Sequence, residues 1–327
     1  MIATSNFSGL TTKLNEWFNE AASLAVESWI GQQVFDVIET NWQVYNALIL
    51  NGAAKFDRVA EGGQLPAGNV SEGDSASFTQ KRYGGRIVVT KDMRMFDRYD
   101  QIEEIVKDNA QYAFDRIDQM MADLILNGFT GSSYTDVLGG TQSNLTADGV
   151  VLFSASHTNN QNSSVEGNLI TNAAGTANPA LDRASIIKAR ADGRTNRDPN
   201  GANRPVTLDR LIVSASNEDL AERTVYSSGI VGTPNVDLNP LKGKVNNILT
   251  WSRLDTRGSD SADTSAYWFM ADSRLAKKTL KAIFAQKPAM YAPTQVDDSK
   301  NWEYTIDAYF TLGLLWPFGI YGSTGAN

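Results

Sequence analysis

The sequence predicts an α+β fold, because helix-forming and strand-forming segments occupy separate stretches of the chain. A helical segment comes first, a long extended segment follows, a helix of nearly thirty residues comes next, and short helices and strands fill the second half. This order has no βαβαβ rhythm, which argues against a doubly wound or barrel enzyme fold. The length of 327 residues allows about two domains of ordinary size and a large buried core.

The composition excludes several kinds of site. The chain has no cysteine and one histidine, so disulfides, thiolate metal sites and multi-histidine metal sites are excluded, and we expect no cofactor. The net charge of −8 argues against a protein whose main task is to wrap nucleic acid, although it allows a protein that surrounds nucleic acid without gripping it. No stretch approaches the roughly 18 apolar residues of a membrane span, and we expect no membrane partner.

Residues 11–40 are predicted to be helical, in two pieces separated at Gly31. Apolar residues recur at spacings of three and four before the glycine, and Val34, Ile38 and Trp42 continue an apolar face after it. An amphipathic core helix and an arm that packs on another subunit both fit this pattern.

Residues 50–93 are predicted to form a long protruding hairpin. The runs 75–83 and 86–90 favour strands, and the turn-rich segment Glu61–Asp74 is the predicted tip. Gly84-Gly85 fits either a tight turn or a glycine kink in one long strand. A two-stranded hairpin buries too little of itself to be stable alone, so we expect it to lie on another surface.

Residues 99–127 carry the strongest helical signal. A continuous apolar stripe runs along them, acidic residues occupy the first turn, and Asn127-Gly128 ends the segment. At 1.5 Å per residue the helix would be about 43 Å long, which is enough to span a whole domain.

The second half is predicted to mix short elements. Ser216–Asp219 is expected to open a short helix as a capping box. The other predicted elements are helices at 180–193 and after Asp272, and strands at 208–213, 248–251, 266–270 and 302–315.

His157 is the only residue that could supply catalytic imidazole, and Ser154 and Ser156 lie beside it in the sequence. A serine nucleophile needs a sharp elbow and a partner carboxylate, and the chain has no Gly-x-Ser-x-Gly. We therefore favour a loop histidine with structural hydrogen bonds. A hydrolase that uses His157 remains the alternative.

Charge is distributed unevenly. Residues 1–80 hold 3 basic and 9 acidic side chains, a net of −6, whereas residues 81–98 hold 6 basic and 2 acidic side chains, a net of +4. Solvated faces, complementary patches on different copies and a basic face toward packaged DNA all fit. The candidate subunit-interface residues are Glu61, Glu72, Asp74, Lys81, Arg82, Arg86, Arg94 and Arg98. A second basic cluster comprises Arg274, Lys277, Lys278 and Lys281.

Seven short segments, taken in order, carry a resemblance to a known family. The strongest is Val151–Asn159, which contains Leu-Phe-Ser-Ala-Ser-His-Thr-Asn; the others are Lys81–Asp92, Pro205–Val213, Asn239–Gly243, Trp268–Asp272, Asn301–Tyr309 and Gly319–Gly322. Together they resemble the major capsid protein of tailed bacteriophages, the Hong Kong 97 fold, and in particular its branch of Mu-type major head subunits. The branch has a Leu-Phe-x-x-x-His-x-Asn element after the long helix. Here Thr158 follows the histidine where glycine is common.

The resemblance implies a division of the chain. Residues 1–49 would be an N-terminal arm, and residues 50–93 would be the extended loop. Residues 94–179 and 286–327 would form the peripheral domain around a spine helix at 99–127, and residues 180–285 the axial domain.

The resemblance also implies a function and partners. The chain would self-assemble as hexamers and pentamers into an icosahedral head that encloses double-stranded DNA, with no catalytic activity. Because the arm begins at once after Met1, we expect a separate scaffold protein and no large N-terminal cleavage. A portal and a possible decoration protein are further expected partners, with assembly in the host cytoplasm. An encapsulin-type shell that encloses protein cargo is an alternative with the same fold.

Overall fold

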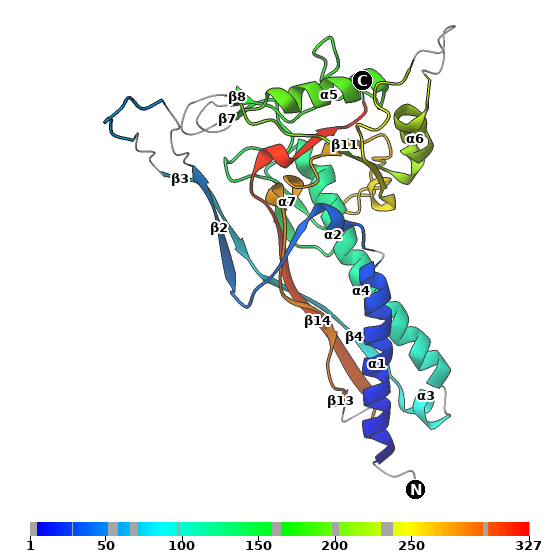
Figure 1. Ribbon diagram of the computed structural model, residues 1–327. Helices are drawn as coiled ribbons and strands as arrows, with labels where there is room; N and C mark the ends of the chain where they lie inside the picture. The colour runs from blue at the N-terminus through cyan, green and yellow to red at the C-terminus, as the bar shows by residue number, and fades with distance from the viewer. Residues whose placement is uncertain are drawn as a thin grey trace.

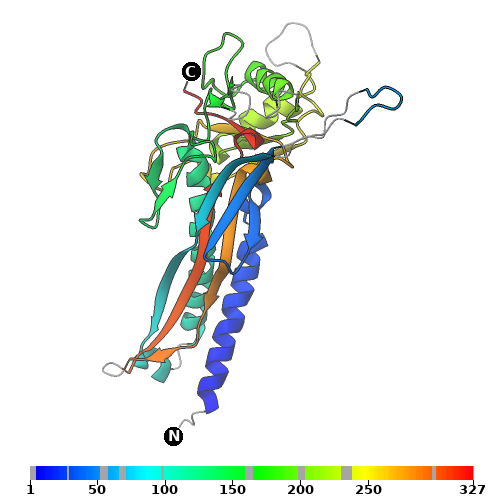
Figure 2. The ribbon, with the colours of Figure 1, turned by 90° about the vertical axis from the view of Figure 1, so that its left-hand side faces the viewer.

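The computed structural model describes residues 5–27, 29–51, 58–65, 71–96, 99–158, 165–197, 203–229, 238–296 and 300–326. The body is elongated, and a hairpin projects from its side (Figures 1 and 2). The helices α1 (Ser5–Glu27) and α4 (Tyr99–Leu126) run side by side along the length of the body. The expected spine helix is therefore present, and it ends in a 3₁₀ turn, η1 (Asn127–Phe129).

A five-stranded sheet lies against the two long helices. It comprises β1 (Asp36–Glu39), β4 (Lys81–Val89), β12 (Leu280–Met290), β13 (Thr294–Gln295) and β14 (Trp302–Leu314). Strand β14 is central, because it pairs antiparallel with β12 and β13 on one side and with β4 on the other. Leu14 and Phe18 of α1 share a buried cluster with Ile102 and Val106 of α4 and with Ile306 of the sheet.

A four-stranded sheet forms the other end of the molecule, in the order β10 (Asn247–Thr250), β9 (Arg210–Val213), β11 (Trp268–Ala271) and β15 (Ile320–Ser323). Its strands are apolar on both faces because both faces are covered. Trp268 and Met270 pack toward α5 (Arg183–Thr195) and α6 (Glu218–Tyr226), whereas Phe269 and Ala271 join the core that contains the end of α4.

The hairpin consists of β2 (Val44–Asn51) and β3 (Ser71–Thr79), which pair antiparallel. The remaining elements are short: α2 (Gly31–Val34), α3 (Lys91–Met95), α7 (Ala276–Thr279), β5 (Ser133–Thr135), β6 (Thr141–Ser143), β7 (His157–Thr158), β8 (Val165–Glu166), η2 (Ala215–Asn217), η3 (Ser252–Leu254) and η4 (Pro317–Gly319).

The prediction of helix up to residue 40 is wrong. Asp36–Glu39 is strand β1, which pairs parallel with β12. Val34 and Ile38 have a helical spacing by coincidence. Strand β12, in which Lys281 lies 245 residues from Asp36, pairs with residues 36–39 and stabilises their extended backbone. Helix α1 also begins before residue 11, and it packs within the chain as a core helix along α4.

The predicted boundaries of the hairpin strands also need correction. The run 75–83 divides at Gln80: β3 ends at Thr79, and β4 belongs to the five-stranded sheet. Gly84 and Gly85 lie within the extended strand β4 and form no turn, which was the second of the two alternatives. A Cβ at Gly84 would lie 2.8 Å from the Ile306 carbonyl oxygen, so glycine permits the close approach of β14. Glu72 and Asp74 lie in β3 and not at the tip.

Two further expectations differ in detail. Strand β12 was not predicted at all. Helix α6 begins at Glu218 without a side-chain cap, because Asn217 instead donates from Nδ2 to the Ser265 carbonyl at 2.7 Å. The expected capping box is therefore absent.

Candidate assembly surfaces and the buried histidine

The base of the hairpin is fixed to the body by one face only. Ala47 and Phe78 are buried against Ile283 and Leu315, together with Tyr45 and Ile49. The Phe78 ring lies on Gly313 of β14, where a Cβ would be only 2.0 Å from the ring. Alternation along β2 turns Val44 and Leu48 to the exposed face. The hairpin is thus half-packed at its base and carries apolar side chains outward.

The outer part of the hairpin extends away from the body (Figures 1 and 2). Glu61 is exposed there, and Leu65 is 84% exposed. A two-stranded ribbon of this kind is marginal in water unless another surface covers it. The reach of the hairpin therefore makes it a candidate for contact with another molecule.

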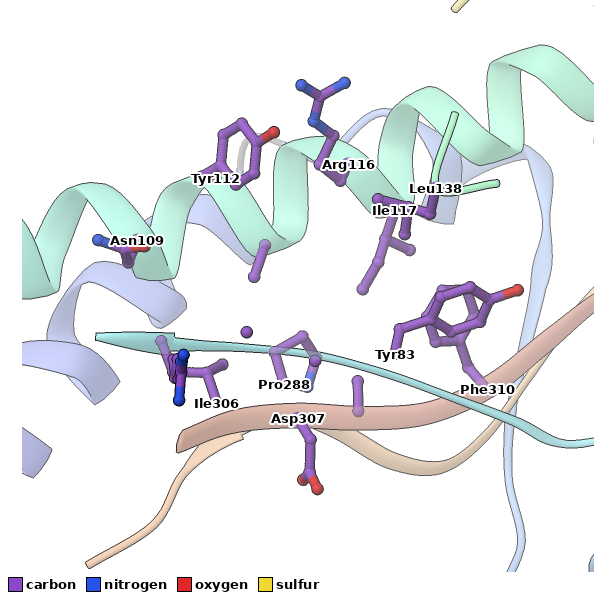
Figure 3. A pocket seen from close by; sticks show the side chains of 15 residues that line it. Tyr83, Asn109, Tyr112, Arg116, Ile117, Leu138, Pro288, Ile306, Asp307 and Phe310 are labelled. Atoms are coloured by element: carbon purple, nitrogen blue, oxygen red, sulfur yellow. The ribbon is translucent and has the colours of Figure 1, made fainter. Parts of the chain in front are cut away.

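A groove of about 200 Å³ lies between α4 and the five-stranded sheet. Figure 3 shows Ile117 pointing from α4 toward the strands and Pro288, whereas Tyr112 and Arg116 extend from the helix away from the strands in this view. The Arg116 guanidinium stacks over the Tyr112 ring, with 4.6 Å from Cζ to the ring centroid. A Cβ at Gly85 would meet no atom within 4 Å. The groove is thus open on the strand side and lined mostly by apolar groups.

A second exposed apolar surface lies at the end of the molecule away from the four-stranded sheet. Met95 and Phe96, at the end of α3, are 68% and 70% exposed. Large apolar side chains side by side at such exposure are typical of contact surfaces.

Three of the sequence-predicted interface residues contact their own chain. Arg82 donates to buried Asp307 at 2.6 Å, which raises the pKa of Arg82. Arg86 lies 3.3 Å from Glu303, and Lys81 donates to the Thr141 carbonyl. Each of the two arginines is thus already paired across β4 and β14.

The other predicted interface residues are less constrained by the structure. Glu61 and Glu72 are exposed, and Asp74 is half-buried. The side chain of Arg94 and the whole of Arg98 lie outside the described residues. The partners of Lys81, Arg82 and Arg86, which are Thr141, Asp307 and Glu303, are not members of the predicted set.

His157 is buried and engaged at both ring nitrogens. Nδ1 lies 2.7 Å from Asp148 Oδ2, and Nε2 lies 3.1 Å from the Leu152 carbonyl oxygen and 3.2 Å from Asn168 Oδ1. The amide of Asn168 donates in turn to the carbonyls of Leu152, Pro317 and Ile320. The cluster ties the loop after α4 to the C-terminal strand, as the structural interpretation predicts.

The charges and serines near His157 fit that structural role. Burial raises the pKa of Asp148, but hydrogen bonds from His157, Thr146 and Val150 outweigh it and leave the pKa below its ordinary value. Ser154 Oγ accepts from the Ser156 amide, and within the described part of the chain no serine hydroxyl has a hydrogen bond to the ring.

The sequence reasoning missed a buried carboxylate that joins three parts of the fold. Asp118 on α4 accepts from the Gly31 amide at 2.9 Å and from Trp251 Nε1 at 2.8 Å. Burial raises the pKa of Asp118 despite these two donors. The signal was available, because Asp118 sits inside the apolar stripe of the spine helix.

The described residues hold neither a metal site nor a membrane-spanning helix. Over the ranges that the structure describes, no group of three or more His, Asp or Glu side chains could hold a metal ion. Within the same ranges, no helix is long and apolar enough to cross a membrane.

Comparison with known families decides the identity. The sequence profile of the phage capsid protein family matches residues 73–322, which include most of β3, the spine helix, the four-stranded sheet down to Gly322 and every strand of the five-stranded sheet except β1. The chain belongs to this family. It is a major capsid protein, and it forms part of the virion shell.

Solved structures agree on the fold of this capsid protein. The capsid of Myoviridae phage XM1 matches with a TM-score of 0.51 at 13% identity over 90% of each chain. The capsid of cyanophage P-SCSP1u gives 0.51 at 12% identity, covering 89% of this chain and 86% of that one. The capsid of the Helicobacter pylori bacteriophage KHP30 gives 0.50 at 10% identity, covering 89% and 86%. The Hong Kong 97-like fold is thus confirmed.

Three further points concern the relatives of the capsid protein. No curated protein matches the capsid protein. The family match favours a phage shell over the encapsulin alternative. The Mu-type branch stays a prediction, because none of the matches bears on it.

Proposed function

We propose that this capsid protein assembles as hexamers and pentamers into an icosahedral head that encloses double-stranded DNA in the host cytoplasm. A separate scaffold, a portal and a possible decoration protein would be its partners. The observation that carries the proposal is the hairpin, whose base is packed and whose outer part extends from the body with Leu65 exposed. Such a segment gains stability only when a second copy covers it.

The two proposed domains correspond to the two sheets. The proposed peripheral domain is centred on the five-stranded sheet and the spine helix, and the proposed axial domain on the four-stranded sheet with α5 and α6. The N-terminal arm would be residues 1–49 and the extended loop residues 50–93. Strand β15 pairs with β11, so the end of the chain would join the two domains.

The structure sharpens the experiment on the hairpin. Removing residues 61–65 shortens the outer part and leaves the β2–β3 pairing intact, whereas a deletion up to residue 74 would also remove paired strand residues. We expect the short deletion to give folded subunits that form no shells. A matched deletion of residues 172–176, a turn closed by the Thr171–Ala177 bridge, is the control.

The readout is sedimentation followed by negative-stain electron microscopy, with and without the candidate scaffold. Normal shells from the 61–65 deletion would contradict the proposed role of the hairpin. A wild-type chain that stays monomeric under every condition would contradict the assembly proposal itself.

We further propose that the eight charged candidate residues take part in contacts between copies and that the chain has no catalytic activity. Because Arg82 and Arg86 already pair with Asp307 and Glu303, reversing them would also disturb the subunit. Glu61→Lys and Glu72→Lys therefore test charge pairing more cleanly, and unchanged particle yield would count against it. A hydrolase would lose activity in His157→Ala, whereas the capsid role involves no activity to lose.

A further inference from the structure

One end of helix α5 carries a cluster of four arginines. Arg190 and Arg194 lie one turn apart on the helix, and Arg197 and Arg204 lie beyond its C-terminal end. The backbone amide of Arg204 donates to the Asn196 carbonyl at 2.8 Å, which holds Arg204 at the end of the helix. We call these four residues the arginine end.

Among the described residues, no carboxylate forms an ion pair with any arginine of this end. Arg190 is only 9% exposed, and burial followed by the charge of Arg194 lowers its pKa. The charge of Asp209 acts on the Arg190 pKa in the opposite direction, and the two oxygens of Asp209 accept from Ser273 at 2.9 Å. Arg204 stacks on Trp316, at 5.6 Å from the ring centroid. Asp209 and Glu166 thus act on Arg190 and Arg197 without forming an ion pair, and the cluster of four arginines keeps an excess of positive charge.

Helix α6 presents the opposite charge. Glu218, Asp219 and Glu222 are all exposed on its surface, and Glu222 has no ion pair within the described part of the chain. Leu220 and Tyr226 are exposed beside them. We call this surface the acidic end.

The two ends face away from each other in one chain. Leu181–Ala184, at the start of α5, line a groove together with Leu220 and Arg223 of α6. Arg194 lies roughly 16 Å farther along the helix at 1.5 Å per residue, and Arg197 acts on Glu166 of β8. Figure 1 accordingly shows α5 between β8 and α6. The arginine end therefore cannot reach the acidic end of the same chain.

We propose that the arginine end of one copy binds the acidic end of the next copy. Guanidinium groups favour carboxylate partners, because their fork of donors matches two oxygens. Two different surfaces that bind head to tail generate a ring when the rotation closes. The contact rests on the proposed assembly function, and it assigns α5 and α6 to the two sides of the ring contact.

Charge reversal tests the contact. Arg194→Glu and Glu222→Arg should each lower the yield of rings and shells about tenfold at about 0.05 M salt, where screening is weak. The double variant should recover most of the yield, because it restores opposite charges across the contact. Arg183→Glu is the matched control, since it changes the same helix at the acidic end and should have little effect. If circular dichroism shows that the Arg194→Glu chain is unfolded, Arg197→Glu takes its place as the test variant.

Cross-linking gives an independent readout, because the chain has no cysteine. Thr195→Cys beside Arg194 and Tyr226→Cys beside Glu222 keep the charges in place. A short bismaleimide should then link copies into a ladder that ends in closed rings, and each single-cysteine chain should give dimers at most.

The outcomes separate this proposal from the assembly function. If wild type forms shells and neither reversal changes the yield, the α5–α6 contact is wrong while the capsid role stands. If wild type forms no rings under any condition, both fail. The last measurement is the binding of a labelled DNA duplex. If Arg194→Glu assembles normally but loses DNA binding by anisotropy, the arginine end binds phosphate and the proposal is overturned.

Discussion

Replacing Gly313 with alanine should detach the hairpin from the body. A Cβ at this position would lie 2.0 Å from Phe78 Cε1 and 2.3 Å from Cδ1. Ordinary contact needs 3.4 Å or more, so the ring must move by well over 1 Å. Among the described residues, the other buried members of the surrounding cluster are Ala47, Ile283 and Leu315.

Two limiting cases set the expected loss of docking free energy. If the ring stays, overpacking of this kind costs about 1–3 kcal/mol. If the ring leaves, the loss is the burial of one phenylalanine side chain, about 1.5–3 kcal/mol. The protein adopts the cheaper response, so Gly313→Ala should lower the free energy of hairpin docking by about 1–3 kcal/mol.

A double-mutant cycle with Phe78→Ala isolates the contact. Without the ring, alanine at position 313 should be neutral or stabilising by up to about 1 kcal/mol, because it removes backbone freedom from the unfolded strand. Native-state hydrogen exchange of β2 and β3 amides, together with urea unfolding of the unassembled subunit, measures both effects. Equal effects of Gly313→Ala in the two backgrounds would refute the steric argument.

The remaining predictions concern buried carboxylates. Asp148→Asn should destabilise the subunit by about 1–3 kcal/mol at neutral pH. Because the folded pKa of Asp148 is lowered, this difference should shrink as the pH falls through that pKa in acid unfolding curves. Asp118→Asn should leave one of its two donors without an acceptor, costing about 1–3 kcal/mol by urea unfolding. Because the folded pKa of Asp118 is raised, wild-type stability should decline relative to this variant as the pH rises from the ordinary pKa to the raised one.

The long helix was predictable because its signal is local. An apolar stripe that recurs every three or four residues determines which face of Tyr99–Leu126 is buried, whatever it packs against. The expected structural role of His157 was also local, since its partner Asp148 lies nine residues away. Strand β12 was not predictable in this way. Pro288 and Lys287 interrupt its apolar pattern, and its partners β1 and β14 come from distant parts of the chain.

The charged candidates show the same limit. Counting charges along a window identified 81–98 as basic, but Asp307, the partner of Arg82, lies 225 residues away. Cross-strand pairing places such residues together, and register is set by packing that no window contains. The arginine end of α5 was overlooked for a related reason: its charge is unremarkable in the sequence, and only the fold brings Arg204 back to the end of the helix that carries Arg190 and Arg194.

The buried and the exposed residues therefore carry different parts of the function. Phe78, Asp118 and His157 are buried with partners inside one chain, so their replacement should change subunit stability before it changes assembly. Leu65 and Glu222 are exposed, and among the residues that the structure describes Glu222 has no ion pair, so replacing either removes little from the isolated subunit. A shell repeats the same contact between many copies. A small loss of binding free energy per contact is therefore multiplied across the particle. Variants of the second kind should thus leave the unfolding free energy of the subunit unchanged while lowering the yield of shells, as expected for residues whose contacts form only between copies.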